Sequence, residues 1–275
     1  MFRFFKNFID KVAPKDHRLI NADYDQDWIN GVGKPEYSAL FSKIDSLLHN
    51  DKNKKILDIA GGNGKLALLL SNKYKTFLVD RIPGFIQQAI KNGFPEEHSL
   101  VSDILKENFT NKIGTFDIVV MKSSMHEFSK KLMPQIHRII FNAINPGGYY
   151  IDWDVHTSNI KIASWLKSFI NTKDHLAGLE NLTRDRWFYT QEEIIESLQK
   201  TGFKNVAVFK HFFYTVSVQK FAKAYWNSEK NRTSEFYSYA VEAVKTAPDE
   251  IKWNLENEDV IIQIPATMII AEKSV

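Results

Sequence analysis

A glycine-rich segment carries the clearest chemical signal in the sequence. Residues 56–65 have the sequence ILDIAGGNGK, in which Asp58 is followed by Gly61, Gly62 and Gly64. Because glycine has no Cβ, the backbone of such a segment can turn tightly and lie close to a ligand. A helix that begins after Gly64 would add free N–H groups at the same place. The segment therefore predicts a ligand-binding loop, with an ordinary strand-to-helix turn as the alternative.

Polar residues also follow two further apolar runs. Asp80 ends the run KTFLVD, and a carboxylate at that position can accept both hydroxyl groups of a ribose. Pro83 and Gly84 come shortly afterwards, so a helix cap or a solvated turn is the alternative for Asp80. Ser102 and Asp103 follow the run HSLV, where the aspartate serves either a ligand or a turn.

Three titratable residues are candidates for moving a proton. His126 lies in the run MKSSMHEF, and the reference pKa of imidazole, about 6.5, suits a base at neutral pH. A loop histidine bonded to the backbone is the alternative. Asp154 and His156 end the run GYYIDWDVH and are the competing candidates for the base or for substrate binding. Solvated residues at the end of a strand are the structural alternative for both.

These residues follow strands in an alternating pattern of strands and helices. From residue 54 onward the chain predicts the strands KKILDIA, KTFLVD, HSLVSD, GTFDIVVMK and GYYIDWDV, with helical segments between them. Thr190 and Glu193 then predict a helix that starts with a capping box, and FKNVAVFKHFF and PATMIIAEK predict two more strands. Such alternation indicates a mostly parallel sheet with helices on both faces. Because ligands bind at the carboxyl ends of parallel strands, we expect the polar residues to meet there.

Outside this pattern the chain has a leading segment and an insert. Residues 1–50 are expected to be helical, and residues 51–211 together with 263–275 to form the α/β domain. Residues 212–262 predict a helical insert whose last helix Pro248 would open. Because a plain hairpin needs only a few residues, the insert is a candidate substrate cap; a helical subdomain or a dimer interface is the alternative. The aromatic residues to examine are Tyr225, Trp226, Tyr237 and Tyr239.

The composition excludes several kinds of chemistry. The 275 residues contain no cysteine, which excludes disulfides, thiolate metal sites, iron–sulfur clusters and a cysteine nucleophile. The net charge of +3 is small, and Lys and Arg are interleaved with Asp and Glu, so no nucleic-acid partner is expected. No apolar run predicts a membrane span or a signal peptide, which favours a cytoplasmic protein. In a less favoured alternative, a basic aromatic helix at the N-terminus contacts lipid.

The glycine-rich segment resembles that of a known enzyme family. The run D-x-A-G-G-N-G is similar to the D-x-G-x-G-x-G loop of Rossmann-like (class I) S-adenosylmethionine-dependent methyltransferases. Ala60 stands where the family has its first glycine, while Gly62 and Gly64 match the other two. The turn NPGG at residues 145–148 also fits, and the similarity covers about residues 54–155. It implies a Rossmann-like doubly wound sheet, mostly parallel with an antiparallel last strand, and S-adenosylmethionine as cofactor.

The resemblance also implies roles for particular residues. The glycine loop would hold the cofactor, Asp80 would bind its ribose, and Asp103 would meet its adenine amino group. Lys122 and Ser123, at the end of the run FDIVVMK, would line the methyl end of the cofactor. The residues expected to bind cofactor are Asp58, Ala60, Gly61, Gly62, Gly64, Asp80, Arg81, Ser102, Asp103, Lys122 and Ser123. We find no convincing set of metal ligands in the sequence.

Methyl transfer from a sulfonium is an in-line displacement. The enzyme chiefly holds a nucleophile against the methyl group, an effect worth up to ~7–11 kcal/mol, and a base adds ~10²–10⁴-fold. We therefore expect O- or N-methylation of a small organic molecule, with Tyr24, Asp27 and Trp28 folding over the cofactor or packing as a core. The alternatives are a methyltransferase acting on RNA or protein, and a non-catalytic cofactor-binding or membrane-associated protein. The sequence leaves the substrate and the choice between monomer and homodimer open.

Overall fold

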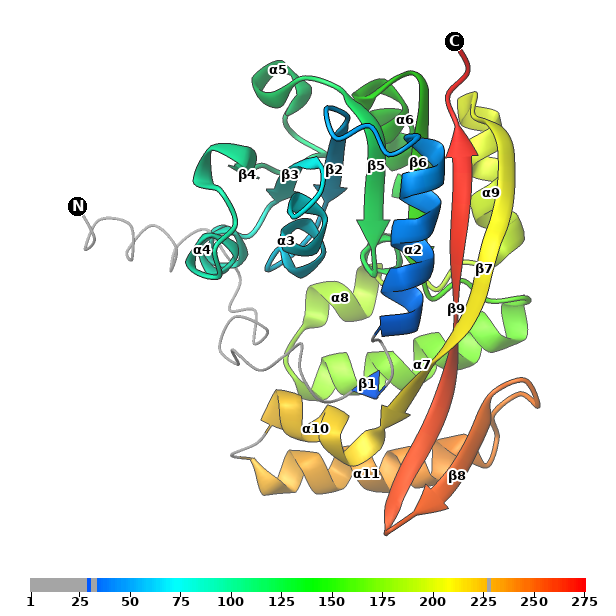
Figure 1. Ribbon diagram of the computed structural model, residues 1–275. Helices are drawn as coiled ribbons and strands as arrows, with labels where there is room; N and C mark the ends of the chain where they lie inside the picture. The colour runs from blue at the N-terminus through cyan, green and yellow to red at the C-terminus, as the bar shows by residue number, and fades with distance from the viewer. Residues whose placement is uncertain (1–28, 31–33, 227–228) are drawn as a thin grey trace.

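A mostly parallel sheet forms the centre of the molecule (Figure 1). The computed structural model describes residues 29–30, 34–226 and 229–275. Within these residues the sheet has nine strands in the order β1-β7-β9-β6-β5-β2-β3-β4, and β8 pairs with β9. The strands are β1 (Ile29–Asn30), β2 (Lys55–Ile59), β3 (Lys75–Asp80), β4 (Ser99–Val101), β5 (Phe116–Lys122), β6 (Ile144–Asp154), β7 (Lys204–Ser217), β8 (Lys252–Glu256) and β9 (Asp259–Glu272).

The strand pairing confirms the predicted fold class. Strands β2 to β6 pair in parallel, whereas β9 runs antiparallel to both β6 and β7. Since β6 and β7 both oppose β9, they point in the same direction. β2 and β3 are buried along almost their whole length, as expected of parallel strands that have helices on both faces. The carboxyl ends of β2, β3, β5 and β6 consequently lie at one edge of the sheet.

Helices cover both faces of the sheet. They are α2 (Lys34–Leu47), α3 (Lys65–Ser71), α4 (Pro83–Lys91), α5 (Thr110–Ile113), α6 (Met133–Ala143), α7 (Ile160–Leu176), α8 (Glu180–Asp185), α9 (Gln191–Thr201), α10 (Val218–Trp226) and α11 (Lys230–Val244), with short 3₁₀ turns η2 (Glu96–His98), η3 (Met125–Glu127) and η4 (Lys130–Leu132). Successive residues of a strand face opposite sides. Ile118 of β5 accordingly packs with Leu40 of α2, and Val119 packs with Ile136 of α6.

The predicted N-terminal helical segment is described only in part. Helix α2 confirms a helix before the first parallel strand, since it buries Leu40 and Ile44 in the core. Tyr24, Asp27 and Trp28, expected over the cofactor, lie outside the described residues. No helix among those that the structure describes is long and apolar enough to cross a membrane.

The hairpin of β7 and β9 extends well beyond the rest of the sheet. Asp154, the last residue of β6, pairs with Thr267 of β9, which pairs with His211 of β7. Both strands then continue past this level, β7 as far as Ser217, because each satisfies the backbone hydrogen bonds of the other. The segment predicted as a helical insert thus begins and ends within strands, and it holds α10, α11 and β8.

One predicted helix in this segment is wrong. Pro248 opens no helix; instead the N–H of Ile251 donates to its carbonyl oxygen at 2.8 Å, in a turn that leads into β8. Proline fixes φ near −65°, a value that suits a turn as well as the first turn of a helix. The sequence therefore predicted the backbone conformation of Pro248, but not that this proline belongs to a turn and not to a helix.

An outer layer of helices packs on the extended hairpin (Figure 1). Phe169 of α7, Phe221 of α10 and Phe236 of α11 form one apolar cluster with Val216 of β7 and Ile264 of β9. Figure 1 shows α7 and α8 lying across the carboxyl ends of the central strands. The polar residues predicted at those strand ends therefore face this outer layer.

The capping box gives the first testable prediction. The Thr190 hydroxyl accepts from the N–H of Glu193 at 3.2 Å, and the Glu193 carboxylate accepts from the N–H of Thr190 at 2.9 Å, as the sequence predicts. We expect Thr190→Ala to lower the free energy of unfolding by about 1 kcal/mol, because the helix loses a cap. Urea denaturation measures the change. Thr190→Ser keeps the hydroxyl and should be closer to the native protein, and equal losses in both variants would contradict the role of the cap.

Candidate functional site

A cavity of about 910 Å³ lies between the strand ends and the outer helices. Its volume is at the upper end of the ~300–1,000 Å³ typical of ligand sites. One wall consists of the residues that follow β2, β3, β4 and β5. The opposite wall comes from α7, α8, the extended part of β7, and α10. All the predicted cofactor-binding residues except Gly64 line this cavity.

The three glycines of the loop have different structural roles. A Cβ added to Gly62 would meet no heavy atom within 4 Å, whereas one added to Gly64 would lie 2.7 Å from Cβ of Ala89. Gly61 is also closely packed, since an added Cβ would lie 2.6 Å from Cγ of Asp58. Only Gly62 therefore leaves room for a ligand against its backbone. The expectation that Gly64 faces the cofactor is not supported, because close packing with α4 requires a glycine there.

Ala60 adopts the backbone conformation that favours glycine. Its φ is +53°, close to the +58° of Gly62 and the +73° of Gly64. A Cβ in this left-handed region costs roughly 1–2 kcal/mol. Ser123, at the end of β5, is similar with φ +54°, and the neighbouring Ser124 hydroxyl donates to the carbonyl of Ala60 at 2.9 Å. The ends of β2 and β5 are thus joined beside the cavity in strained conformations.

Asp58 is a buried carboxyl group beneath the loop. Its Oδ2 accepts from the N–H of Ala67 at 3.0 Å, and its Oδ1 has no hydrogen-bond partner among the described residues. Burial raises the pKa of Asp58 to about 7, although the positive charge of Lys122 opposes this increase. Lys122 itself lies over the Trp153 ring, with Nζ 5.2 Å from the ring centre. An acceptor buried in this way would be satisfied by a donor on a ligand.

Asp80 connects the end of β3 to the glycine loop. Its Oδ2 accepts from the N–H of Gly62 at 2.9 Å and its Oδ1 from the N–H of Ile82 at 2.8 Å. Both Asp80 and the following Arg81 line the cavity. The carboxylate therefore lies at the cavity and also makes the turn contacts that were the alternative.

Ser102 and Asp103 line the cavity after β4. The Ser102 hydroxyl donates to Glu107 at 3.2 Å, and Asp103 accepts from the N–H of Leu105 at 3.1 Å. Lys106 also lies 3.2 Å from the Asp103 carboxylate. Asp103 thus caps a turn and is exposed to the cavity at the same time, so both interpretations of this residue remain compatible with its contacts.

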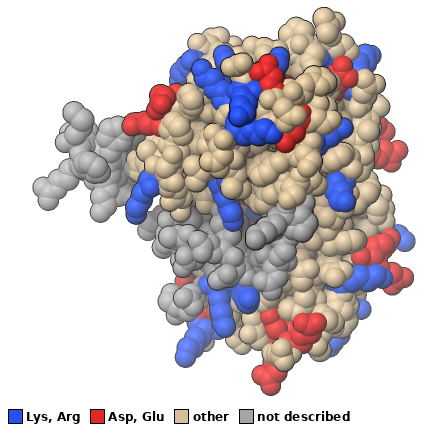
Figure 2. Space-filling model, viewed as in Figure 1, with Lys and Arg blue, Asp and Glu red and all other residues tan. Residues whose placement is uncertain are grey.

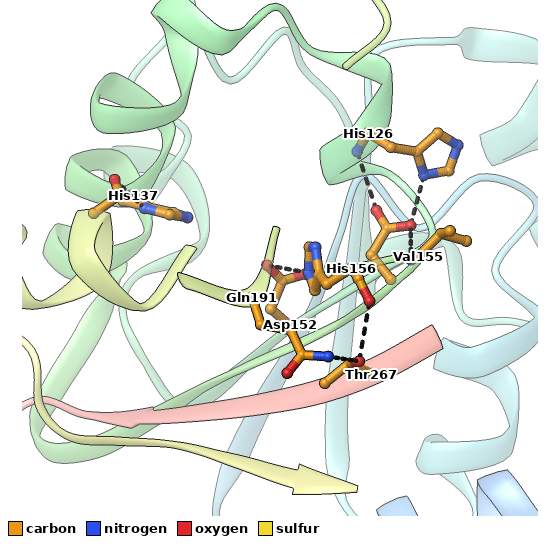
Figure 3. A network of polar contacts seen from close by, with 9 residues as sticks. His126, His137, Asp152, Val155, His156, Gln191 and Thr267 are labelled. Atoms are coloured by element: carbon orange, nitrogen blue, oxygen red, sulfur yellow. Dashed lines mark hydrogen bonds and ion pairs between the residues drawn. The ribbon is translucent and has the colours of Figure 1, made fainter. Parts of the chain in front are cut away.

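His126, labelled in Figure 3, forms a closely bonded pair with Asp154. Nδ1 of His126 lies 2.6 Å from Oδ1 of Asp154, and the backbone N–H of His126 donates to Oδ2 at 3.1 Å. The N–H of Val155 donates to Oδ1 at 2.6 Å. Burial alone would raise the pKa of Asp154, but His126, His156 and this N–H together lower it well below its usual range. The carboxylate is therefore ionised and accepts a hydrogen bond from Nδ1–H.

This geometry determines which imidazole nitrogen can act as a base. In the neutral imidazole with Nδ1–H donating to Asp154, Nε2 of His126 carries the free lone pair. The ring lines the cavity, whereas Asp154 lies behind it and is fully buried. Phe188 stacks on the imidazole with ring centres 5.3 Å apart and planes 7° from parallel. The ring is thus held in one orientation at the cavity wall.

His156 lies away from the cavity. Its side chain is 1% exposed and it is absent from the cavity wall. Nε2 of His156 is 3.1 Å from Oδ2 of Asp152 (Figure 3). Burial alone would lower the pKa of His156, but Asp152 reverses the effect and raises it. Because His156 is buried and does not line the cavity, it is not suited to the role of base that the sequence left open for it.

The opposite wall contains residues that the sequence did not identify. Leu166, Phe169 and Ile170 of α7, Tyr214 and Val216 of β7, and Phe221 of α10 give it an apolar surface. Among the four aromatic residues predicted for a cap, Tyr225 lines the cavity. Tyr225 and Trp226 are buried, and Tyr237 and Tyr239 pack against the apolar cluster of α7, α10 and α11. Within the described part of the chain, no three His, Asp or Glu residues converge as a metal site requires.

Comparisons with known proteins bear on this fold. The profile of a methyltransferase-domain family matches residues 34–208. No curated protein matches the chain. The chain is similar to the crystal structure of YcgJ from Bacillus subtilis, with a TM-score of 0.67 and 16% identity over 87% of this chain and 99% of that one.

Two similar structures contain the cofactor or its product. One is Haemonchus contortus phosphoethanolamine N-methyltransferase 2 with phosphomonomethylethanolamine and S-adenosylhomocysteine (TM-score 0.61, 14% identity, 98% of this chain and 61% of that one). The other is human N-acetylserotonin methyltransferase with S-adenosylmethionine (TM-score 0.52, 14% identity, 88% of this chain and 52% of that one). At such identities the likeness shows a shared fold.

The glycine loop gives a prediction that separates ligand contact from packing. Gly62→Asn should weaken the binding of S-adenosylhomocysteine at least about tenfold, because its side chain would enter the cavity. Asparagine tolerates the left-handed conformation better than other residues, so the fold should persist. Gly93→Asn is the matched control, because Gly93 has φ +99°, open space around it and no place on the cavity wall. Native-like affinity of folded Gly62→Asn in calorimetry would show that the loop does not face the cofactor.

Asp80 gives a second prediction about the cofactor. Asp80→Ala removes an acceptor for the ribose and also releases the N–H of Gly62. Since each charge-assisted hydrogen bond is worth ~1.5–3 kcal/mol, affinity for S-adenosylhomocysteine should fall at least about tenfold. Asp249→Ala removes an exposed carboxylate away from the cavity and should bind normally. Unchanged affinity in a folded Asp80→Ala variant would be incompatible with ribose binding.

Proposed function

Because this chain belongs to the Rossmann-like (class I) S-adenosylmethionine-dependent methyltransferases, we propose that it methylates a hydroxyl or amino group of a small organic molecule. The cofactor, when bound, supplies an electrophilic methyl group on its sulfonium. The observation that carries the proposal is the His126–Asp154 pair, which lies on the wall of the same cavity as the glycine loop.

The residues around the loop fit this cofactor. Gly62 leaves space in which a ligand can lie against the backbone. Oδ1 of Asp58 is buried and has no hydrogen-bond partner among the described residues, so it accepts a hydrogen bond from a donor on the ligand. Asp80, Ser102 and Asp103 line the part of the cavity formed by the ends of β3 and β4, where they bind the ribose and the adenine.

His126 acts as the general base in this proposal. Nε2 would take the proton that the acceptor's hydroxyl or amino group loses when it is methylated. The imidazole becomes positively charged, and the Asp154 carboxylate bonded to Nδ1 stabilises that charge. Phe188 keeps the ring stacked in place, so the proton acceptor does not have to be reoriented during the reaction.

Two observations support a small acceptor molecule. The outer wall of the cavity is aromatic and apolar, which suits a ring or a short chain. On the face drawn in Figure 2, Lys and Arg side chains are interspersed with Asp and Glu and form no continuous basic stripe of the kind that binds nucleic acid. Relatives named for phosphoethanolamine and N-acetylserotonin act on small acceptors, which is consistent with this proposal.

The end of β7 and helix α10 form the substrate cap in this proposal. Tyr214 and Val216 of β7, with Phe221 and Tyr225 of α10, contribute the wall that faces the strand ends. The strands bring these residues there because β7 runs parallel to β6 and continues past its carboxyl end. Tyr225 is the member of the predicted aromatic set that reaches the cavity.

His126 is tested by substitution. Once an acceptor is found by transfer of a labelled methyl group to small-molecule, RNA or protein fractions, His126→Asn should lower kcat by ~10²–10⁴-fold. Binding of S-adenosylhomocysteine should stay unchanged, because the base does not hold the cofactor. His175→Asn is the control, since His175 is 70% exposed on α7. If kcat fell only a few-fold, catalysis would depend on positioning of the substrates and not on His126 as a base. Transfer of the label to RNA or protein would contradict a small acceptor molecule.

A further inference from the structure

Three charged side chains form a buried group at the outer wall of the cavity. Asp174, at the end of α7, is fully buried and bonds two cations through different oxygens. Lys173 contacts Oδ1, and Nε of Arg186 donates to Oδ2 at 2.7 Å. Lys173 and Arg186 both line the cavity, whereas Asp174 lies behind them. The group therefore presents its two cations, and not its carboxylate, to whatever occupies the cavity.

Arg186 retains hydrogen-bonding capacity toward the cavity. A guanidinium has five N–H donors, and Arg186 uses Nε for Asp174. Among the described residues, no acceptor bonds its terminal Nη atoms, although the side chain is only 5% exposed. A buried guanidinium in this state is suited to a bidentate acceptor such as a carboxylate or phosphate. The bond to Asp174 also fixes the guanidinium plane before a ligand arrives.

The charge of Arg186 favours an anion at this point. Its guanidinium is buried and shares the Asp174 carboxylate with Lys173, and a buried charge is costly unless an opposite charge compensates it. Burial by itself lowers the pKa of Arg186, but Asp174 and, at longer range, Glu127 raise it, so the guanidinium stays charged. Glu127 is only half-buried and is therefore better screened by solvent than Asp174.

Arg186 lies close to the residues that hold His126. Arg186 and Phe188 are two residues apart and both line the cavity, and Phe188 stacks on His126. Two residues of extended chain span about 7 Å. A small molecule anchored at Arg186 could therefore place a nucleophile near Nε2 of His126. Phe221 and Tyr225, whose rings lie 5.6 Å and 4.1 Å from Nζ of Lys173, give such a molecule an apolar surface.

We propose that Arg186, supported by Lys173 and fixed by Asp174, anchors an anionic group, a carboxylate or a phosphate, of the methyl acceptor. This inference rests on the proposed function and specifies its substrate class. The acceptor is thus a small apolar or aromatic acid whose anionic end binds at the outer wall. Its hydroxyl or amino group lies toward His126.

Matched probes test the proposal on the native protein. Calorimetry is carried out on protein saturated with S-adenosylhomocysteine, using benzoate, phenyl phosphate, benzamide and benzylamine. Benzoate or phenyl phosphate should bind at least about tenfold more tightly than benzamide, because only the anions form charge-assisted bonds with Arg186. The stronger of the two anions identifies carboxylate or phosphate as the group. Equal affinity for benzamide, preference for benzylamine, or no binding of either anion would overturn the proposal.

Variants assign the effect to Arg186. Arg186→Gln should lose at least about tenfold in affinity for the better anion and keep its affinity for S-adenosylhomocysteine. Lys161→Met is the control, since Lys161 is exposed at the start of the same α7 helix. An unchanged anion affinity in Arg186→Gln would overturn the assignment, and the native-protein comparison decides the matter if that variant does not fold. Failure of the native protein to bind S-adenosylhomocysteine would instead contradict the proposed function itself.

Discussion

The parallel direction of β2, β3, β5 and β6 is the constraint on which the site depends. Because these strands end at one edge, the loop after Asp58, the carboxylate of Asp80 and the segment with His126 meet there although they are far apart in sequence. β6 also brings Asp154 behind His126, since it pairs with β5 up to Trp153. The direction of the strands thus assembles the glycine loop and a bonded imidazole in one cavity.

A second element completes the cavity from outside the parallel sheet. The β7–β9 hairpin continues past the level of Asp154, and α7, α10 and α11 pack on its extension. Burial of apolar side chains holds this outer layer together. Lys173 and Arg186, both bonded to the buried Asp174, place positive charge at the cavity wall. The inner wall is therefore suited to the cofactor and the base, and the outer wall to recognition of the acceptor.

The sequence predicted the features that depend on local pattern. The strand–helix alternation predicted the sheet, and residues at or just after the strand ends, Asp58, Asp80 and His126 among them, line the cavity. Contacts between distant segments were not predictable: Gly64 is required by Ala89 of α4, and His156 is buried beside Asp152. Arg186 and Phe188 lie in an irregular segment. Their spacing of two residues, which puts both on one side of an extended chain, was the one feature of the sequence that could have indicated a shared place on the cavity wall.

In the proposed function, the cofactor and Nε2 of His126 face one reaction point inside the cavity. A crystal structure with S-adenosylhomocysteine and a bound acid probe tests this most directly. We predict the ribose hydroxyls at Asp80, the adenosine along the ends of β3 and β4, and the sulfur directed toward Nε2 of His126. A cofactor that binds in this cavity with its sulfur turned away from His126, or that binds elsewhere, would contradict the account.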